Sequence, residues 1–252
     1  MKSGKIKVFT VVTLVALFLA FVAGWIWFNS PPPQIPIPTP NGYDVLAQAS
    51  ASVEQSILTE DETKLKEFLA LNSGPLREVD KAMQMECVVP IDFNAGMAAL
   101  PQPKSRDAFR LLNARAKVLH QDGDANAAAI EWAKMFDLAT KIDDGGALVH
   151  VLSAIGCESM ALDGLDSVVA ELSPEQKQEV LTILKAAERK PHDFEKIQEI
   201  EHAVVRGEYG AIFGGYITAV AGGQSKNAMD AGRDADARVI GQLETVVKAL
   251  QQ

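Results

Sequence analysis

The stretch LLNARAKVLHQDGDANAAAIEWAKMF, residues 111–136, decides the fold that this sequence predicts. On both sides of Gly123 and Asp124, apolar residues recur every three or four positions, which is the spacing of one face of an α-helix. Glycine suits the left-handed residue that ends a helix, and aspartate suits the cap of the next. We therefore predict two amphipathic helices, residues 105–121 and 124–142, joined by a tight turn. Their apolar stripes are Phe109, Leu112, Ala116 and Leu119, then Ala128, Trp132, Met135, Ala139 and Ile142.

Helical periodicity recurs through the rest of the chain after residue 42. No segment shows the sustained alternation of β-branched residues that is typical of a strand. The predicted fold class is therefore all-α, with about eight to ten helices in one domain of residues 43–252. The further predicted helices are residues 43–58, 59–71, 75–83, 147–172, 173–190, 193–208 and 229–249, and residues 88–104 form an irregular connection.

Residues 111–136 also resemble one tetratricopeptide-type helical hairpin. Leu112, Ala116 and Leu119 match the large, small and large positions of that family's first helix, and Ala128 and Trp132 match the A-x₃-F pair of its second. Arg115 stands where the family has leucine, and no second unit follows at the family's period of 34 residues. The resemblance implies an antiparallel helical hairpin, a unit that commonly serves protein binding.

The N-terminus carries the pattern of a membrane anchor. An uncharged run begins at Val8 and ends at Phe28, and its 21 residues at about 1.5 Å each would cross a hydrocarbon core of about 30 Å. The lysines in residues 1–7 predict a cytoplasmic N-terminus by the positive-inside rule, and Trp25 and Trp27 suit the opposite interface. Cleavage as an export signal is the alternative, although the run is longer than the apolar region of about 7–15 residues in usual signal peptides.

Residues 29–42 predict a stalk. Six prolines fall in this segment, and proline-rich chains form an extended polyproline II helix of about 3.1 Å per residue. The alternative role is a ligand for a proline-binding groove. The whole plan, with a basic tail, an anchor, a stalk and helices, resembles uncharacterised bacterial single-pass membrane proteins. That resemblance implies a bacterial cytoplasmic membrane protein whose C-terminal domain is extracytoplasmic.

Charge and cysteine content limit the partners. Without the three N-terminal lysines, 21 basic residues remain against 33 acidic ones, so the predicted ectodomain carries a net charge of −12. This balance argues against nucleic acid and anionic lipid head groups, because both need clustered cations. Cys87 and Cys157 would both lie in an oxidising compartment, where they either form a disulfide or remain two buried thiols.

No established catalytic motif appears, and no cofactor or metal is expected. Glu199 and His202 form a single E-x-x-H, whereas a di-iron bundle needs two. We interpret His192 beside Asp193 as part of a helix start.

A glycine-rich apolar segment of residues 211–221 is too short to span a bilayer. It is either a buried helix or a membrane-dipping or partner-binding loop. Its candidate contact residues are Gly210, Phe213, Gly214 and Tyr216.

These patterns lead to one functional hypothesis and two alternatives. The first is a non-catalytic helical module, anchored in the lipid bilayer through residues 8–28, that binds another protein or peptide. The second is an enzyme whose helical active site lies near Glu199, Glu201 and His202. The third is a structural envelope protein that self-associates through its last helix.

Overall fold

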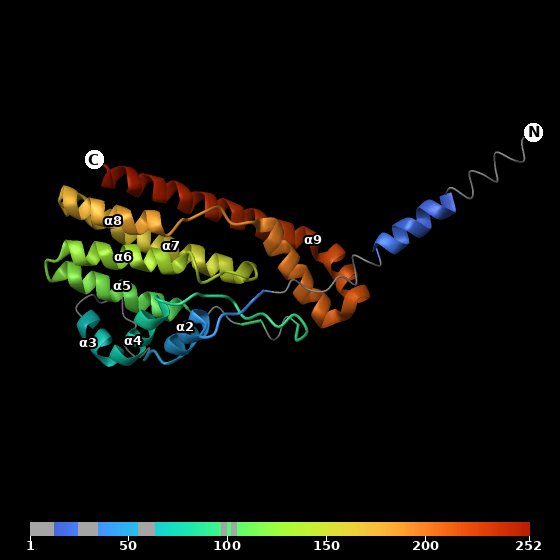
Figure 1. Ribbon diagram of the computed structural model, residues 1–252, viewed down its shortest axis with the longest axis horizontal. Coiled ribbons are helices and arrows are strands. Elements are labelled where there is room, and N and C mark those ends of the chain that lie inside the picture. The colour runs from blue at the N-terminus through green and yellow to red at the C-terminus, as the bar shows by residue number, and fades with distance from the viewer. Residues whose placement is uncertain (1–12, 25–34, 55–63, 97–99, 102–104) are drawn as a thin grey trace, which may run out of the picture.

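The computed structural model describes residues 13–24, 35–54, 64–96, 100–101 and 105–252, except for the side chains of residues 211–225. Within these ranges the protein is helical and contains no strand, so the all-α prediction is confirmed. Figure 1 shows a layered helical bundle, with the N-terminal helix Thr13–Gly24 standing apart at one end. The elements are α2 (Gly42–Ala51), α3 (Leu65–Leu71), α4 (Ser73–Ala82), α5 (Arg106–Gln121), α6 (Ala125–Ala139), α7 (Leu148–Val168), η4 (Val169–Glu171), α8 (Pro174–Ala186) and α9 (Phe194–Leu250).

Helix α6 lies at the centre of the bundle and packs against α5, α7 and α8. It follows α5 through a short turn, in which Gly123 has a φ of +88° and the carboxylate of Asp124 accepts a hydrogen bond from the Ala127 N–H at 2.9 Å. The indole N–H of Trp132 donates to Asn113 on α5 at 2.9 Å, and its ring faces α7. The apolar stripe of α6 is thereby buried between its neighbours, and alanines allow the close approach.

The first helix of the bundle is shorter than the sequence predicts. The prediction was residues 43–58, but α2 ends at Ala51. Beyond it, the side chain of Asn72 accepts a hydrogen bond from the Glu54 N–H at 2.7 Å and donates to the Phe68 carbonyl at 2.9 Å. Local side-chain hydrogen bonds of this kind compete with helix propagation. The capping sequence expected at residues 59–62 lies outside the described residues.

The last part of the chain was predicted as two helices, residues 193–208 and 229–249, and it does form two helical limbs, although the second begins directly after Gly210 and not at residue 229. A single element, α9, runs over 57 residues and is broken at Gly210, where φ is 72° and ψ is 167°. A Cβ placed on Gly232 would lie 2.8 Å from the ring of Phe194, so the two limbs of α9 meet at their base. The guanidinium of Arg233 also lies 5.5 Å from the centre of that ring. Helix α9 therefore leaves the bundle, reverses and returns (Figure 1).

A second, smaller core lies where the chain from the N-terminus enters the bundle. Ile35 packs on Gly145, because a Cβ at that glycine would lie 3.0 Å from the isoleucine side chain. The residues after Ile35 run without regular secondary structure to α2. This second core consists of Phe93, Ala147, Ile200, Ala203 and Val204, with Ile35, Ile91 and Leu100 partly buried against them.

Of the described helices, one is long and apolar enough to cross a membrane by length and composition, namely Leu148–Glu171. Half of its apolar stretch is buried inside the protein, and it carries the fully buried Glu158, so we assign it to the bundle core. The described part of the predicted anchor, Thr13–Gly24, is an apolar helix with exposed large side chains, such as Phe21 at 66%. The rest of residues 8–28 and the prolines at 31–33 lie outside the described residues.

Candidate functional site

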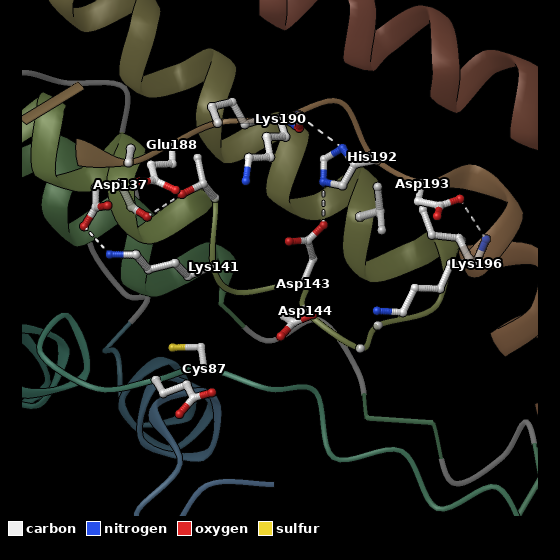
Figure 2. A pocket seen from close by; sticks show the side chains of 18 of the residues that line it. Cys87, Asp137, Lys141, Asp143, Asp144, Glu188, Lys190, His192, Asp193 and Lys196 are labelled. Carbon is white, nitrogen blue, oxygen red and sulfur yellow. Dashed lines mark hydrogen bonds and ion pairs between the residues drawn. The ribbon is translucent and has the colours of Figure 1, made fainter. Parts of the chain in front are cut away.

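A cleft of 1190 Å³ opens between three connecting segments of the bundle (Figure 2). One wall is the chain after α4, the second is the connection between α6 and α7, and the third is the connection between α8 and α9. Loops held by a rigid scaffold are the usual position for binding residues. The polar lining residues labelled in Figure 2 are Asp137, Lys141, Asp143, Asp144, Glu188, Lys190, His192, Asp193 and Lys196.

Charges of both signs line this cleft. Lys141 forms an ion pair with Asp137 at 2.6 Å, one helical turn away. Lys190 and Lys196 are exposed, and Figure 2 shows them on either side of the central His192. The chain after α4 adds the apolar side chains of Met83 and Met85. The cleft therefore offers a ligand both charged and apolar contacts.

Beneath the cleft lies a buried ion network centred on Arg189. Its side chain is 4% exposed, and its Nε lies 2.8 Å from Oε1 of Glu158, whose side chain is fully buried. Nη2 of Arg189 donates to Oε2 of the same carboxylate at 3.0 Å and also forms a short ion pair with Asp236 on α9. Burial raises the pKa of Glu158, and the nearby Arg189 opposes that rise.

His192 continues the network between two carboxylates. Its Nε2 lies 2.7 Å from Asp143 Oδ2, and its Nδ1 lies 2.7 Å from Asp236 Oδ1. Burial lowers the pKa of His192, but the hydrogen bond and charge of Asp143 outweigh it, so the pKa is raised above its usual value. Burial would raise the pKa of Asp236, yet hydrogen bonds from His192 and Arg189 lower it. Both ring nitrogens lie within hydrogen-bond distance of carboxylate oxygens, which only accept hydrogen bonds, so this arrangement favours the imidazolium form of His192.

The network joins four parts of the chain that are distant in sequence. Glu158 belongs to α7, Asp143 to the connection before α7, and Asp236 to the returning limb of α9. Arg189 and His192 lie in the connection between α8 and α9. A buried ion pair contributes little net stability compared with apolar packing, but breaking one is costly. The network thus ties two of the cleft walls, the α6–α7 and α8–α9 connections, to α7 and to the returning limb of α9.

The two cysteines are free, buried thiols in the structure. Cys87 lines the cleft, and burial raises its pKa to about 11. Cys157 lies on α7, where burial and the neighbouring Glu158 raise its pKa to about 12. Protonated thiols are poor nucleophiles, so neither side chain is activated for chemistry in this environment.

The residues near the single E-x-x-H do not converge on the cleft. The carboxylate of Glu201 accepts a hydrogen bond from the Leu148 N–H at 2.8 Å and so caps the first turn of α7. Glu199 is exposed, and neither residue lines the cleft. Burial and the charge of Arg206 lower the pKa of His202. Glu201 therefore has a structural partner of its own.

The candidate contact segment lies on α9 beyond the bundle. Gly210 is exposed and occupies the break in the helix. Phe213, Gly214 and Tyr216 follow it in the returning limb, and their side chains are among those not described. The backbone of this segment is helical, and because its side chains are not described, the choice between a buried helix and a membrane-dipping or partner-binding segment stays a prediction.

Sequence reasoning missed the ion network, because it interpreted His192 only as part of a helix start. Asp193 does cap α9 and accepts hydrogen bonds from Glu195 and Lys196, whereas His192 turns inward. One signal was available. Glu158 occupies the apolar stripe of its helix, three residues after Ile155 and four before Leu162. An ionisable residue at a core position requires a buried partner of opposite charge.

The ionisable side chains of the site act here through ion pairing. Among the described residues, no group of three or more histidine, cysteine, aspartate or glutamate side chains is arranged to hold a metal ion. No protein-family model, curated protein or solved structure matches the chain.

Proposed function

We propose that this protein is a membrane-tethered, non-catalytic helical module that binds a segment of another protein in the cleft between α4, α6 and α9. The observation that carries the proposal is the cleft itself, two of whose walls are joined by the buried ion pairs of Arg189 and His192. The third wall is held by the hydrogen bond from the Val89 N–H to the Asp144 carbonyl at 2.8 Å. Binding surfaces gain affinity when they are organised before the ligand arrives, and these contacts within the protein support such an organisation.

The tether is supported by the N-terminal helix Thr13–Gly24. Its large apolar side chains are exposed, including Leu17, Phe18 and Phe21. Exposing this many apolar groups to water is unfavourable, whereas a bilayer core accepts them. We place this helix in a bacterial cytoplasmic membrane, with residues 1–7 inside, the proline-rich residues 29–42 as a stalk and residues 43–252 outside.

The scaffold of the module resembles a helical hairpin of the tetratricopeptide type in α5 and α6. The small residues Ala116 and Ala128 are fully buried, which supports close packing of the two helices. Arg115, which replaces the leucine of that family, forms ion pairs with Asp80 at 2.8 Å and with Glu131. The second helix of the hairpin, α6, leads directly into the α6–α7 connection, which is one of the cleft walls.

The chemistry of the cleft favours an extended peptide segment. Lys190 and Lys196 can pair with acidic side chains of a ligand, and Asp144 and Glu86 can pair with basic ones. Methionine side chains adapt to varied apolar shapes, so Met83 and Met85 suit the remaining side chains of a peptide. A ligand with both charged and apolar residues matches this lining best.

Photo-crosslinking in intact cells tests the binding site. A photoreactive amino acid placed at Lys190 or Lys196 should give a discrete adduct with one other protein. The matched control is Lys185, an exposed lysine on α8 that does not line the cleft. Adducts of equal yield at position 185, or none at the two cleft positions, would contradict the proposal.

Alkaline carbonate extraction tests the tether separately. The intact protein should remain with the membrane pellet, because a spanning apolar helix is not released by high pH. A variant with Leu17→Glu and Phe18→Lys should shift to the supernatant, since charged groups in the bilayer core are strongly disfavoured. Release of the unaltered protein into the supernatant would show that no spanning anchor is present.

A further inference from the structure

Part of α9 projects beyond the core of the bundle. Buried side chains of the outgoing limb end at Val204, and those of the returning limb resume at Met229. None of the described side chains between these two residues is buried. We call residues 205–228 the α9 arm. The chain reverses at Gly210. The outgoing limb packs against the connection before α5 as far as Gly207 and Glu208, because a Cβ on Gly207 would meet the Phe93 carbonyl and a Cβ on Gly96 would meet Glu208. The tip of the arm is therefore the part of the chain around Gly210.

The arm carries a long uncharged stretch at its tip. The 17 residues from Tyr209 to Ser225 contain no acidic or basic side chain. Their sequence is YGAIFGGYITAVAGGQS. Tyr209 is 47% exposed, and the stretch adds the aromatic residues Phe213 and Tyr216. Tyrosine and phenylalanine combined with aliphatic residues are typical of segments that lie at a membrane–water interface.

The base of the arm coincides with the arrival of the chain from the N-terminal helix. Ile35 packs in the same small core as Ile200 and Val204 of the outgoing limb. Figure 1 shows the reversal of α9 at the end of the bundle from which the N-terminal helix extends. The tip of the arm and the N-terminal helix therefore lie at the same end of the molecule.

We infer that the tip of the α9 arm inserts into the lipid–water interface of the bilayer that holds the N-terminal anchor, an inference that rests on the proposed tether. The partner is the apolar interface rather than anionic head groups, because no charge lies between Glu208 and Lys226. Without the three N-terminal lysines, the chain has 21 basic and 33 acidic residues, and this net charge of −12 also opposes binding to an anionic surface. Insertion should therefore occur on neutral phosphatidylcholine and withstand high salt.

Depth-dependent fluorescence quenching in the intact protein tests the inference. The protein is reconstituted into phosphatidylcholine vesicles with an environment-sensitive fluorophore on a single cysteine, and Cys87 and Cys157 are replaced by alanine. The labelled positions are Phe213→Cys at the tip, Gly241→Cys as the control and Leu19→Cys in the anchor. Gly241 is exposed on the returning limb of α9, and a Cβ there meets no atom within 4 Å.

The expected result is a blue shift at position 213 and loss of its fluorescence with lipids that carry a shallow nitroxide. Position 241 should show neither, and position 19 should respond to a deep nitroxide. Tyr216→Asp combined with Ile217→Asp should abolish the response at 213, and high salt should leave it unchanged. Circular dichroism confirms that each variant is folded.

The outcomes separate the arm from the tether. Quenching at position 19 without quenching at 213 overturns the inference and leaves the tether intact. No quenching at 19 refutes the tether itself. Protection of position 213 from aqueous iodide without quenching by nitroxide lipids would mean that the tip is covered by another protein or by a second copy. Loss of the nitroxide quenching in high salt would mean that the tip binds through the charge of the head groups. Either of these results contradicts the inference.

Discussion

The indole ring of Trp132 on α6 packs directly against Gly164 on α7. A Cβ added to Gly164 would lie 2.3 Å from two atoms of the ring, which is far closer than any van der Waals contact. Gly164→Ala should therefore lower the free energy of unfolding by about 1–3 kcal/mol, the usual effect of overpacking a core. Urea unfolding of the intact protein in detergent, followed by circular dichroism, measures the change.

Gly156 on the same helix is the matched control. A Cβ there meets no atom within 4 Å, so Gly156→Ala should leave stability unchanged or raise it by up to about 1 kcal/mol through helix propensity. Similar stability changes for the two alanine variants would refute the packing of Trp132 on α7.

Arg189 should be among the most sensitive charged positions. Arg189→Met removes the cation and leaves the carboxylates of Glu158 and Asp236 buried without this partner. The substitution should lower the free energy of unfolding by about 3–5 kcal/mol. Arg233→Met is the control, because the ion pair of Arg233 with Asp230 is half exposed and such pairs contribute about 0–1 kcal/mol. Equal losses in the same urea assay would mean that the network is not buried as described.

Stability should decline as pH rises through the folded pKa of His192. That pKa is raised above 6.5, the usual value of a free imidazole, so the stabilisation by the imidazolium is complete below 6.5 and is lost as pH rises through the folded pKa. His192→Gln should remove this decline, which urea unfolding at about pH 5 and about pH 9 would detect. The exposed His120, paired with Glu171 at 3.0 Å, provides the control His120→Gln. Retention of the full decline in His192→Gln would assign it to another group.

Asn41 should anchor the start of α2 to the chain after α4. Its Nδ2 donates to the Val88 carbonyl at 2.8 Å, and its Oδ1 accepts from the Val88 N–H at 3.1 Å. Asn41→Ala leaves buried backbone groups without partners and should cost about 1–3 kcal/mol. Asn41→Asp keeps the acceptor but places a carboxylate oxygen against the Val88 carbonyl at a buried position, so it should cost at least as much in thermal unfolding. A clearly smaller loss for the aspartate variant would contradict the assigned hydrogen bonds.

Helical spacing predicted the fold class because each stripe is a local property of the sequence. The positions Ala128, Trp132 and Met135 were predicted as one face of a helix, and all three are buried. The ion network could not be predicted in the same way, since Arg189 and Asp236 are 47 residues apart. Their contact depends on α9 folding back on itself at Gly210, and a glycine within a helical pattern does not by itself reveal a reversal.

Residues 8–28 illustrate a different limit. Their apolar length predicts an anchor from composition alone, and the described part, Thr13–Gly24, is helical. The cleft, in contrast, arises from three connections that have no periodic pattern, such as the segment around Asp143 and Gly145. Connections are set by the packing of the helices that they join, so their residues come together only in the folded molecule.

The packing of Ile35 on Gly145 has a mechanical consequence. Gly145 lines the cleft, so Ile35, in the segment that leads from the N-terminal helix, packs directly on one of the cleft walls. Tension or tilt transmitted along the stalk would act on that wall directly. By reciprocity, a ligand that favours one position of the wall would also favour one orientation of the stalk. With the proposed tether, ligand binding in the cleft and the orientation of the helical domain relative to the membrane are thermodynamically linked.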